Sequence, residues 1–140
     1  MNVENDIRNV ELLTKIFGRF PSFHDAEVLS LVLERGERDI SGPTLETRIH
    51  VFEMTSEVVE NKRIVLKNHS IVRFRFSDIV NLEIDEFNHQ NVLSGLYIDR
   101  NQDQGAETSQ FKVTFEGIYG MHAVFGCRRI SVESVEPYER

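Results

Sequence analysis

The chain has 140 residues, of which 40% are hydrophobic and 28% charged, a composition typical of one globular domain and not of a disordered chain. Its formal net charge is −7 at pH 7, which argues against a nucleic-acid partner and is compatible with a basic protein partner. Cys127 is the single cysteine, so an internal disulfide is excluded. No apolar run is long enough to span a bilayer, and the first residues do not resemble a signal peptide. We therefore expect a cytoplasmic protein with no membrane partner.

The first predicted element is a helix over about residues 6–17. Its apolar residues recur at helical spacing, as in Ile7, Val10, Leu13 and Phe17. Asn5 or Asp6 is a suitable residue to cap its start. Gly18 stands where a left-handed residue would end the helix, and Pro21 prevents its continuation.

From about residue 26 to residue 135 the hydrophobic period changes to two, which predicts strands. About seven strands are expected, at 26–36, 45–53, 70–76, 81–87, 95–99, 111–117 and 121–135. Residues 101–109 form a polar loop between two of them. The apolar face of the second and third strands contains Leu45, Thr47, Ile49, Val51, Val72, Phe74 and Phe76. On the opposite face, Arg73 or Arg75 is expected to match an acid such as Glu46 across the strands.

No crossover helices lie between these strands, so parallel βαβ units are not expected. The predicted fold class is α+β, an N-terminal helix packed on a largely antiparallel curved sheet of about six to seven strands. One domain covers residues 1–140, without an internal repeat or linker. The pattern leaves open whether the strands form one curved sheet or an open barrel.

Residues 17–28, which join the helix to the first strand, combine three phenylalanines, a proline and a His-Asp-x-Glu cluster. On one interpretation Phe17, Phe20 and Phe23 fill the core, and His24 and Asp25 satisfy backbone groups in a turn. On another, the aromatic rings and the neighbouring charges are exposed as a recognition surface for a protein. The two interpretations are compatible with each other.

A third interpretation is a metal-dependent hydrolase that uses the His24-Asp25-x-Glu27 cluster. The other histidines, at 50, 69, 89 and 122, are scattered singly and have no spacing typical of metal ligands. Phosphate-loop and dinucleotide patterns do not occur, and Cys127 lies in an alternating strand as a small buried side chain would. We therefore assign no catalytic residue, no metal ligand and no cofactor, and expect a protein that is not an enzyme.

The segment FGRFPSFHDAEVLSLVLERG, at 17–36, resembles the signature of the bacterial immunity protein 50 family. The later segments IHVFEMT, HSIVRFRF and FNHQNVLSGL also resemble the family, as does ISVESVEP after Cys127. The resemblance extends from about residue 12 to residue 137. Phe20 departs from the family pattern, where tryptophan is more common, but an aromatic ring is retained. The matched signature residues are Pro21, Phe23, His24, Asp25 and Glu27.

This resemblance implies an immunity protein, which would bind a cognate toxin domain in a stoichiometric complex and block it inside the producing cell. The candidate toxin contacts are exposed carboxylates of the first two strands and the turn before them, at Asp25, Glu27, Glu34 and Glu46. The alternatives are a small-ligand-binding or self-associating sheet domain, or the hydrolase described above. Whether the chain is a monomer or a homodimer is left open.

Overall fold

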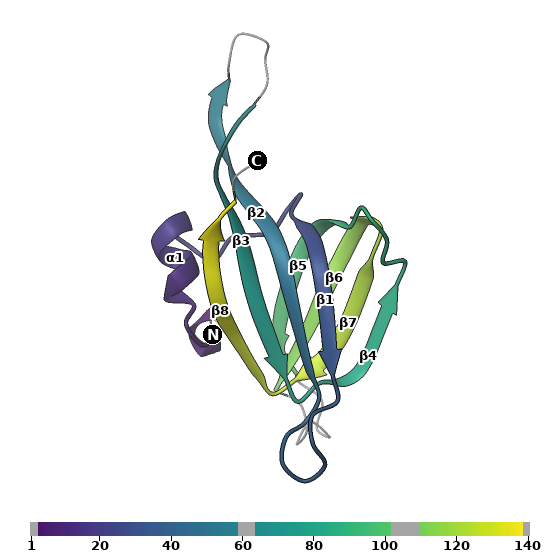
Figure 1. Cartoon of the computed structure of the whole chain (residues 1–140). Coiled ribbons are helices and arrows are strands. Elements are labelled where there is room, and N and C mark those ends of the chain that lie inside the picture. Colours follow the sequence, from purple (N-terminus) through teal and green to yellow (C-terminus); the bar gives the residue numbers. More distant parts are fainter. Residues whose placement is uncertain (1–2, 59–63, 102–109, 139–140) are drawn as a thin grey trace.

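A computed structural model describes residues 3–58, 64–101 and 110–138 (Figure 1). The polar loop expected at 101–109 lies outside the described residues from 102 onward. The helices are η1 (Val3–Asp6) and α1 (Glu11–Phe17); the strands are β1 (Glu27–Glu34), β2 (Thr44–Val58), β3 (Ile64–Ser77), β4 (Val80–Asp85), β5 (Val92–Arg100), β6 (Phe111–Tyr119), β7 (His122–Cys127) and β8 (Arg129–Pro137). The α+β class therefore fits loosely, because strands dominate and the α-helix is short.

The strands form one antiparallel sheet in the order β4-β7-β6-β5-β1-β2-β3-β8. The sheet curves strongly, so that β5 and β6 pass behind β1 and β2, and β7 and β4 follow at the right of the view (Figure 1). Phe76 on β3 contacts Phe115 on β6 and Phe125 on β7, at ring-centroid distances of 6.0 and 5.1 Å. The hydrophobic core thus lies inside the curve, and the fold is one open curved sheet.

The described part of the chain has eight strands, one more than the sequence predicts, because residues 121–135 form two strands. Arg128 is the corner between them: β7 pairs with β6 and β4, whereas β8 pairs with β3 at the other end of the sheet. The Arg128 amide donates to the Ser77 carbonyl at 3.0 Å, which fixes the corner. The corner residue is not a Gly, Pro or Asn, the usual turn signals, but the alternation changes phase there. The buried positions are odd on β7 and even on β8, and two consecutive exposed residues, Arg128 and Arg129, lie between them.

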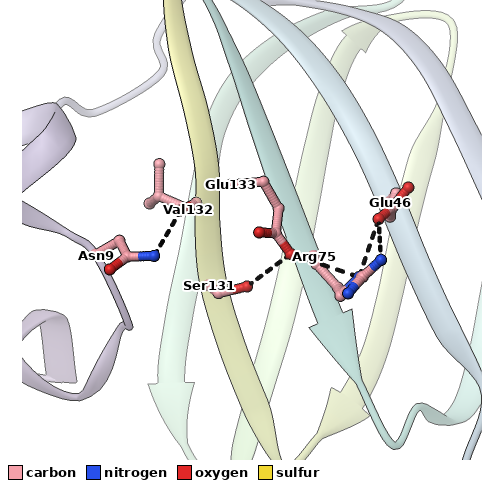
Figure 2. Close-up of polar contacts among 6 residues, drawn as sticks. All are labelled: Asn9, Glu46, Arg75, Ser131, Val132 and Glu133. Atoms are coloured by element: carbon pink, nitrogen blue, oxygen red, sulfur yellow. Dashed lines mark hydrogen bonds and ion pairs between the residues drawn. The ribbon is translucent and has the colours of Figure 1, made fainter.

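The prediction that the helix begins near residue 6 is wrong, since α1 begins at Glu11. The backbone of Arg8 pairs with β8 instead: its amide donates to the Ile130 carbonyl, and its carbonyl accepts from the Val132 amide, both at 2.9 Å. Asn9 has a left-handed φ of 62°, and its side-chain amide donates to the Val132 carbonyl at 3.3 Å (Figure 2). Tertiary pairing with the sheet edge therefore overrides the helical pattern of these residues.

The expected capping residues Asn5 and Asp6 lie in or beside η1 and do not cap α1, whose N-cap, Val10, makes no side-chain capping bond. The end of the helix is as predicted. Gly18 has φ 76°, and its amide donates to the Thr14 carbonyl at 2.7 Å. After α1, which lies beside the edge strand β8, the chain runs to β1 (Figure 1).

The predicted alternation in β2 and β3 is confirmed. The buried side chains of these strands include Leu45, Thr47, Ile49, Val51, Val72, Phe74 and Phe76. Leu13 and Phe17 of α1 join the same core, whereas Phe20 is only partly buried. No helix in the described ranges is long and apolar enough to cross a membrane.

Candidate functional site

The signature segment, which we define as residues 21–27, joins α1 to β1 and is anchored by its buried members. Pro21 is buried, and Phe23 is only 1% exposed. The Phe23 ring lies 5.6 Å from that of Phe20 and 5.7 Å from that of Phe74 on β3. The interpretation of this segment as an architectural joint is therefore confirmed for its aromatic anchor.

The backbone of the segment adopts a conformation that side chains with a Cβ rarely tolerate. Phe23 and Asp25 have φ of 64° and 65°, in the left-handed region. Backbone hydrogen bonds hold this turn against β5: the Asp25 amide donates to the Leu93 carbonyl at 2.8 Å, and the Leu93 amide donates to the Ala26 carbonyl at 2.9 Å. Such strain persists only where the surrounding structure enforces it, and it is often found at functional sites.

The turn presents two polar side chains, His24 and Asp25, whose side chains are 58% and 40% exposed. His24 Nδ1 lies 3.2 Å from the Ser94 carbonyl oxygen, and because a carbonyl only accepts, Nδ1 carries the proton. In the neutral ring, Nε2 is then an acceptor. It faces Asp25 Oδ2 at 3.9 Å, so a charged pair forms here only when the ring takes up a second proton.

A substitution at Asp25 separates the backbone strain from the charge. We expect Asp25→Ala to be less stable than Asp25→Gly by about 1 kcal/mol, because glycine adopts the left-handed conformation without a Cβ penalty. Urea unfolding of the two variants measures this difference. Asp25→Asn, which tolerates the same φ, should match the wild type, and equal stability of the alanine and glycine variants would show that the turn is not strained.

The remaining candidate acids lie on one face of the sheet, opposite to the core. Glu27 is paired with His50, and Glu34 with Thr44, in the β1–β2 register. Since Thr44, Glu46 and His50 alternate on the same side of β2, Glu27, Glu34 and Glu46 share this outer face. Glu34 follows Glu27 by seven positions along β1, which is about 23 Å of extended strand. Asp25 and Glu27 therefore lie at one end of β1, and Glu34 and Glu46 lie near the other.

Glu46 is not a free carboxylate on this face. Arg75 on β3 contacts Glu46 at 2.7 Å and Glu133 on β8 at 3.5 Å, so that a row of three charges crosses three strands (Figure 2). Ser131 donates to Glu133 in the same row at 3.2 Å. The predicted match of Arg75 with Glu46 is confirmed. The pairing reduces the negative charge that Glu46 offers to a partner.

A comparison with known protein families shows to which family the chain belongs. The family model described as Immunity protein 50 matches residues 9–138. The chain belongs to the Immunity protein 50 family. No curated protein and no solved structure matches it. The family assignment made from the signature segment is therefore confirmed, and the match includes both the joint and the whole sheet.

In this Immunity protein 50 chain the Glu46–Arg75 pair is expected to add little stability. Both side chains are partly exposed, at 29% and 49%, and exposed pairs contribute about 0.2–1 kcal/mol. A double-mutant cycle with Glu46→Gln and Arg75→Met should give a coupling free energy below about 1 kcal/mol that decreases as salt is added. A coupling above about 2 kcal/mol, insensitive to salt, would contradict this.

The sequence pattern misses a contact between two histidines in this family member. His50 Nε2 lies 3.0 Å from His69 Nδ1, and His50 is only 5% exposed. The rings of Phe52 and Tyr138 pack around them, the latter 4.3 Å from the His50 ring. The two histidines are 19 positions apart, and only the antiparallel register of β2 and β3 could have brought them together in a prediction.

The hydrolase hypothesis requires several ligands to converge on one ion. Among the residues that the structure describes, no group of three or more His, Cys, Asp or Glu side chains is placed to hold a metal. Among the described residues, the polar contacts of the His24 side chain are with Asp25 and the Ser94 carbonyl. The geometry therefore offers this hypothesis no support beyond the pair itself.

Cys127 on β7 is fully buried, as the alternating pattern predicts. Burial, with a smaller effect of the Asp78 charge, raises the pKa of its thiol to about 12. The reactive form of cysteine is the thiolate, so the folded protein keeps this group unreactive at neutral pH.

Proposed function

We propose that the chain is an immunity protein that binds and neutralises a cognate bacterial toxin domain by forming a stoichiometric complex, in the cytoplasm and without catalysis or a cofactor. The observation that carries this proposal is the match of the Immunity protein 50 model to residues 9–138. The acidic chain, with a net charge of −7, would attract a basic toxin domain over a long range.

The proposed contact surface is the outer face of β1 and β2 together with the turn at residues 24–25. Its support is the exposure of His24 and Asp25 on an enforced turn and the position of Glu27 and Glu34 on one sheet face. A standard interface uses about 800 Å² of each partner, a patch about 30 Å across. Such a patch is wide enough to include both ends of β1.

Co-expression tests the function directly. The partner is the C-terminal domain encoded immediately upstream of this chain, and the readouts are host survival and co-purification. Rescue of the host together with a one-to-one complex is the expected result. If the neighbouring domain is harmless alone, or if no complex forms, the immunity assignment fails for this pair.

Charge reversal tests the surface separately from the function. We expect Glu34→Lys to weaken a toxin complex about tenfold at low salt, chiefly through slower association. Glu83→Lys on β4 is the matched control, because Glu83 is also an exposed strand carboxylate but lies on the far edge of the sheet. If both reversals leave a tight complex intact, the surface assignment is wrong even though the function stands.

A further inference from the structure

A cleft with an unusual charge opens where the segment before α1 meets the ends of β3 and β5 and the β7–β8 corner. Its volume is about 730 Å³, and five arginines line it: Arg8, Arg75, Arg100, Arg128 and Arg129. Among the described residues of its lining the only acids are Asp6 and Glu133, so this described part of the lining has a formal charge of +3, whereas the whole chain has −7. We call this hollow the arginine cleft.

The arginines come from four separate parts of the chain, so the cleft is not the polar face of a single strand. Arg8 precedes α1, Arg75 lies on β3 and Arg100 lies at the end of β5. Arg128 is the corner between β7 and β8, and Arg129 is the first residue of β8. The fold therefore gathers these guanidinium groups, and an acidic chain would not gain such a local excess of positive charge by solvating its surface alone.

Two donors in the cleft are available to an incoming acceptor. Arg8 is exposed and has no ion pair or side-chain hydrogen bond within the described ranges. Arg100 contacts Asp6 through Nη2, but its Nε is buried and has no hydrogen-bond partner among the described residues. Buried donors are almost always satisfied, so an unpaired one that lines a cleft marks a place for an acceptor.

The other contacts of the cleft indicate which acceptor it takes. Arg75 binds Glu46 and Glu133, and Arg129 binds Asp78 at 3.0 Å, so carboxylates are the groups that these guanidiniums already engage. Guanidinium and carboxylate form two parallel hydrogen bonds in a planar fork, which gives such contacts their direction. The lining is polar and the cleft is open at the surface, which suits a charged protein segment better than an apolar small molecule.

We propose that the arginine cleft binds an acidic segment of the partner protein, an assignment that rests on the proposed function and extends it. Arg75 belongs both to the cleft and to the outer sheet face through its pair with Glu46, so the two surfaces adjoin. An interface with an acidic face beside a basic cleft fixes the orientation of the partner, because a rotated partner would bring like charges together.

The first test uses the isolated full chain and a hexaglutamate peptide at low salt, with affinity measured by titration calorimetry. The double variant Arg8→Gln/Arg129→Gln should bind about tenfold more weakly, because it removes two exposed positive charges of the cleft that would pair with the carboxylates of the peptide. The control Arg38→Gln/Arg73→Gln makes the same charge change at exposed arginines outside the cleft, and it should bind within about twofold of the wild type. Urea unfolding verifies that both double variants are folded.

Three outcomes overturn the assignment. They are the absence of peptide binding, equal weakening in the two double variants, and tighter arginine-dependent binding of inorganic pyrophosphate than of hexaglutamate. The last result would assign the cleft to a phosphate ligand. Tight peptide binding that depends on the cleft arginines and not on the control arginines supports the proposal.

Co-expression then separates this proposal from the proposed function. If the wild type rescues the host and Arg8→Gln/Arg129→Gln loses the complex, both proposals are supported. If both chains rescue the host and bind the toxin equally, the cleft assignment is overturned and the immunity function stands. If the wild type does not rescue the host, the immunity function fails, and the peptide titration alone decides whether the cleft takes an acidic segment.

Discussion

Replacement of Phe23 with alanine is expected to lower the free energy of unfolding by about 3–5 kcal/mol, the largest effect of any single substitution considered. Phe23 is 1% exposed, and its ring contacts those of Phe20 and Phe74. Truncation removes this buried area and leaves a cavity between the signature segment and β3 that rigid strands do not close. Since a domain of this size is stable by only about 5–15 kcal/mol, the variant should unfold at a much lower urea concentration.

Two further variants show whether the loss of stability in Phe23→Ala comes from the buried ring or from the backbone conformation. Phe87→Ala also removes a phenyl ring, but from a residue that is 46% exposed. It should lower the free energy of unfolding by less than about 1 kcal/mol. Phe23→Gly deletes one more carbon than Phe23→Ala, yet it should be no less stable, because glycine accepts the φ of 64° at this position. A glycine variant less stable than the alanine variant by about 1 kcal/mol would contradict the left-handed conformation.

Local pattern was sufficient to predict the parts of the fold in which each residue has one role. The period-two alternation of β2 and β3 identified their buried residues because one face of each strand lies on the core. Gly18 ended the helix as expected, since a left-handed residue at that point needs no tertiary contact. In the same way, the aromatic density of residues 17–23 was enough to indicate a buried joint.

The parts that pattern could not predict depend on contacts distant in sequence. Residues 7–9 lie within the helical pattern, but the backbone of Arg8 pairs with β8 more than a hundred positions later. The β7–β8 corner at Arg128 is enforced by the pairing of the two strands with opposite ends of the sheet. The first pairing leaves no local signal, so the predicted helix was too long. The corner leaves only a weak one, the shift of apolar positions from odd to even across Arg128 and Arg129, and the prediction therefore had one strand too few.

The same limit applies to the candidate sites. Asp25 and Glu27 could be selected from the signature segment alone, because they are only two positions apart in the sequence. The arginine cleft could not, since its members lie between residues 8 and 129 and meet only after the sheet curves. The net charge of −7 is a sum over the whole chain, and a sum does not show that arginines distant in sequence gather in one cleft.

The stability of the protein is expected to decrease between pH 9 and pH 12 in a manner that depends on Cys127. Its pKa is raised from 9.0 to about 12 in the folded state, by burial first and by the Asp78 charge second. The protonated thiol is therefore retained by the fold, while the unfolded chain releases the proton above pH 9. This contribution is fully present below pH 9 and is lost as the pH rises toward 12, at about 1.4 kcal/mol per pH unit, or about 2 kcal/mol by pH 10.5.

Cys127→Ala isolates the contribution of the thiol to the pH dependence of stability. The Tyr, Lys and Arg side chains are the same in the variant and the wild type, so their effects cancel in the difference between the two proteins. Below pH 9 the variant should be less stable than the wild type by a constant amount, owing to the lost buried sulfur. Above pH 9 the difference should shrink and then reverse, since only the wild type must keep a thiol protonated inside its core. Urea unfolding at intervals from pH 8 to pH 11 measures the two curves, and parallel curves across that range would mean that the thiol ionises as readily in the folded protein as in the unfolded chain.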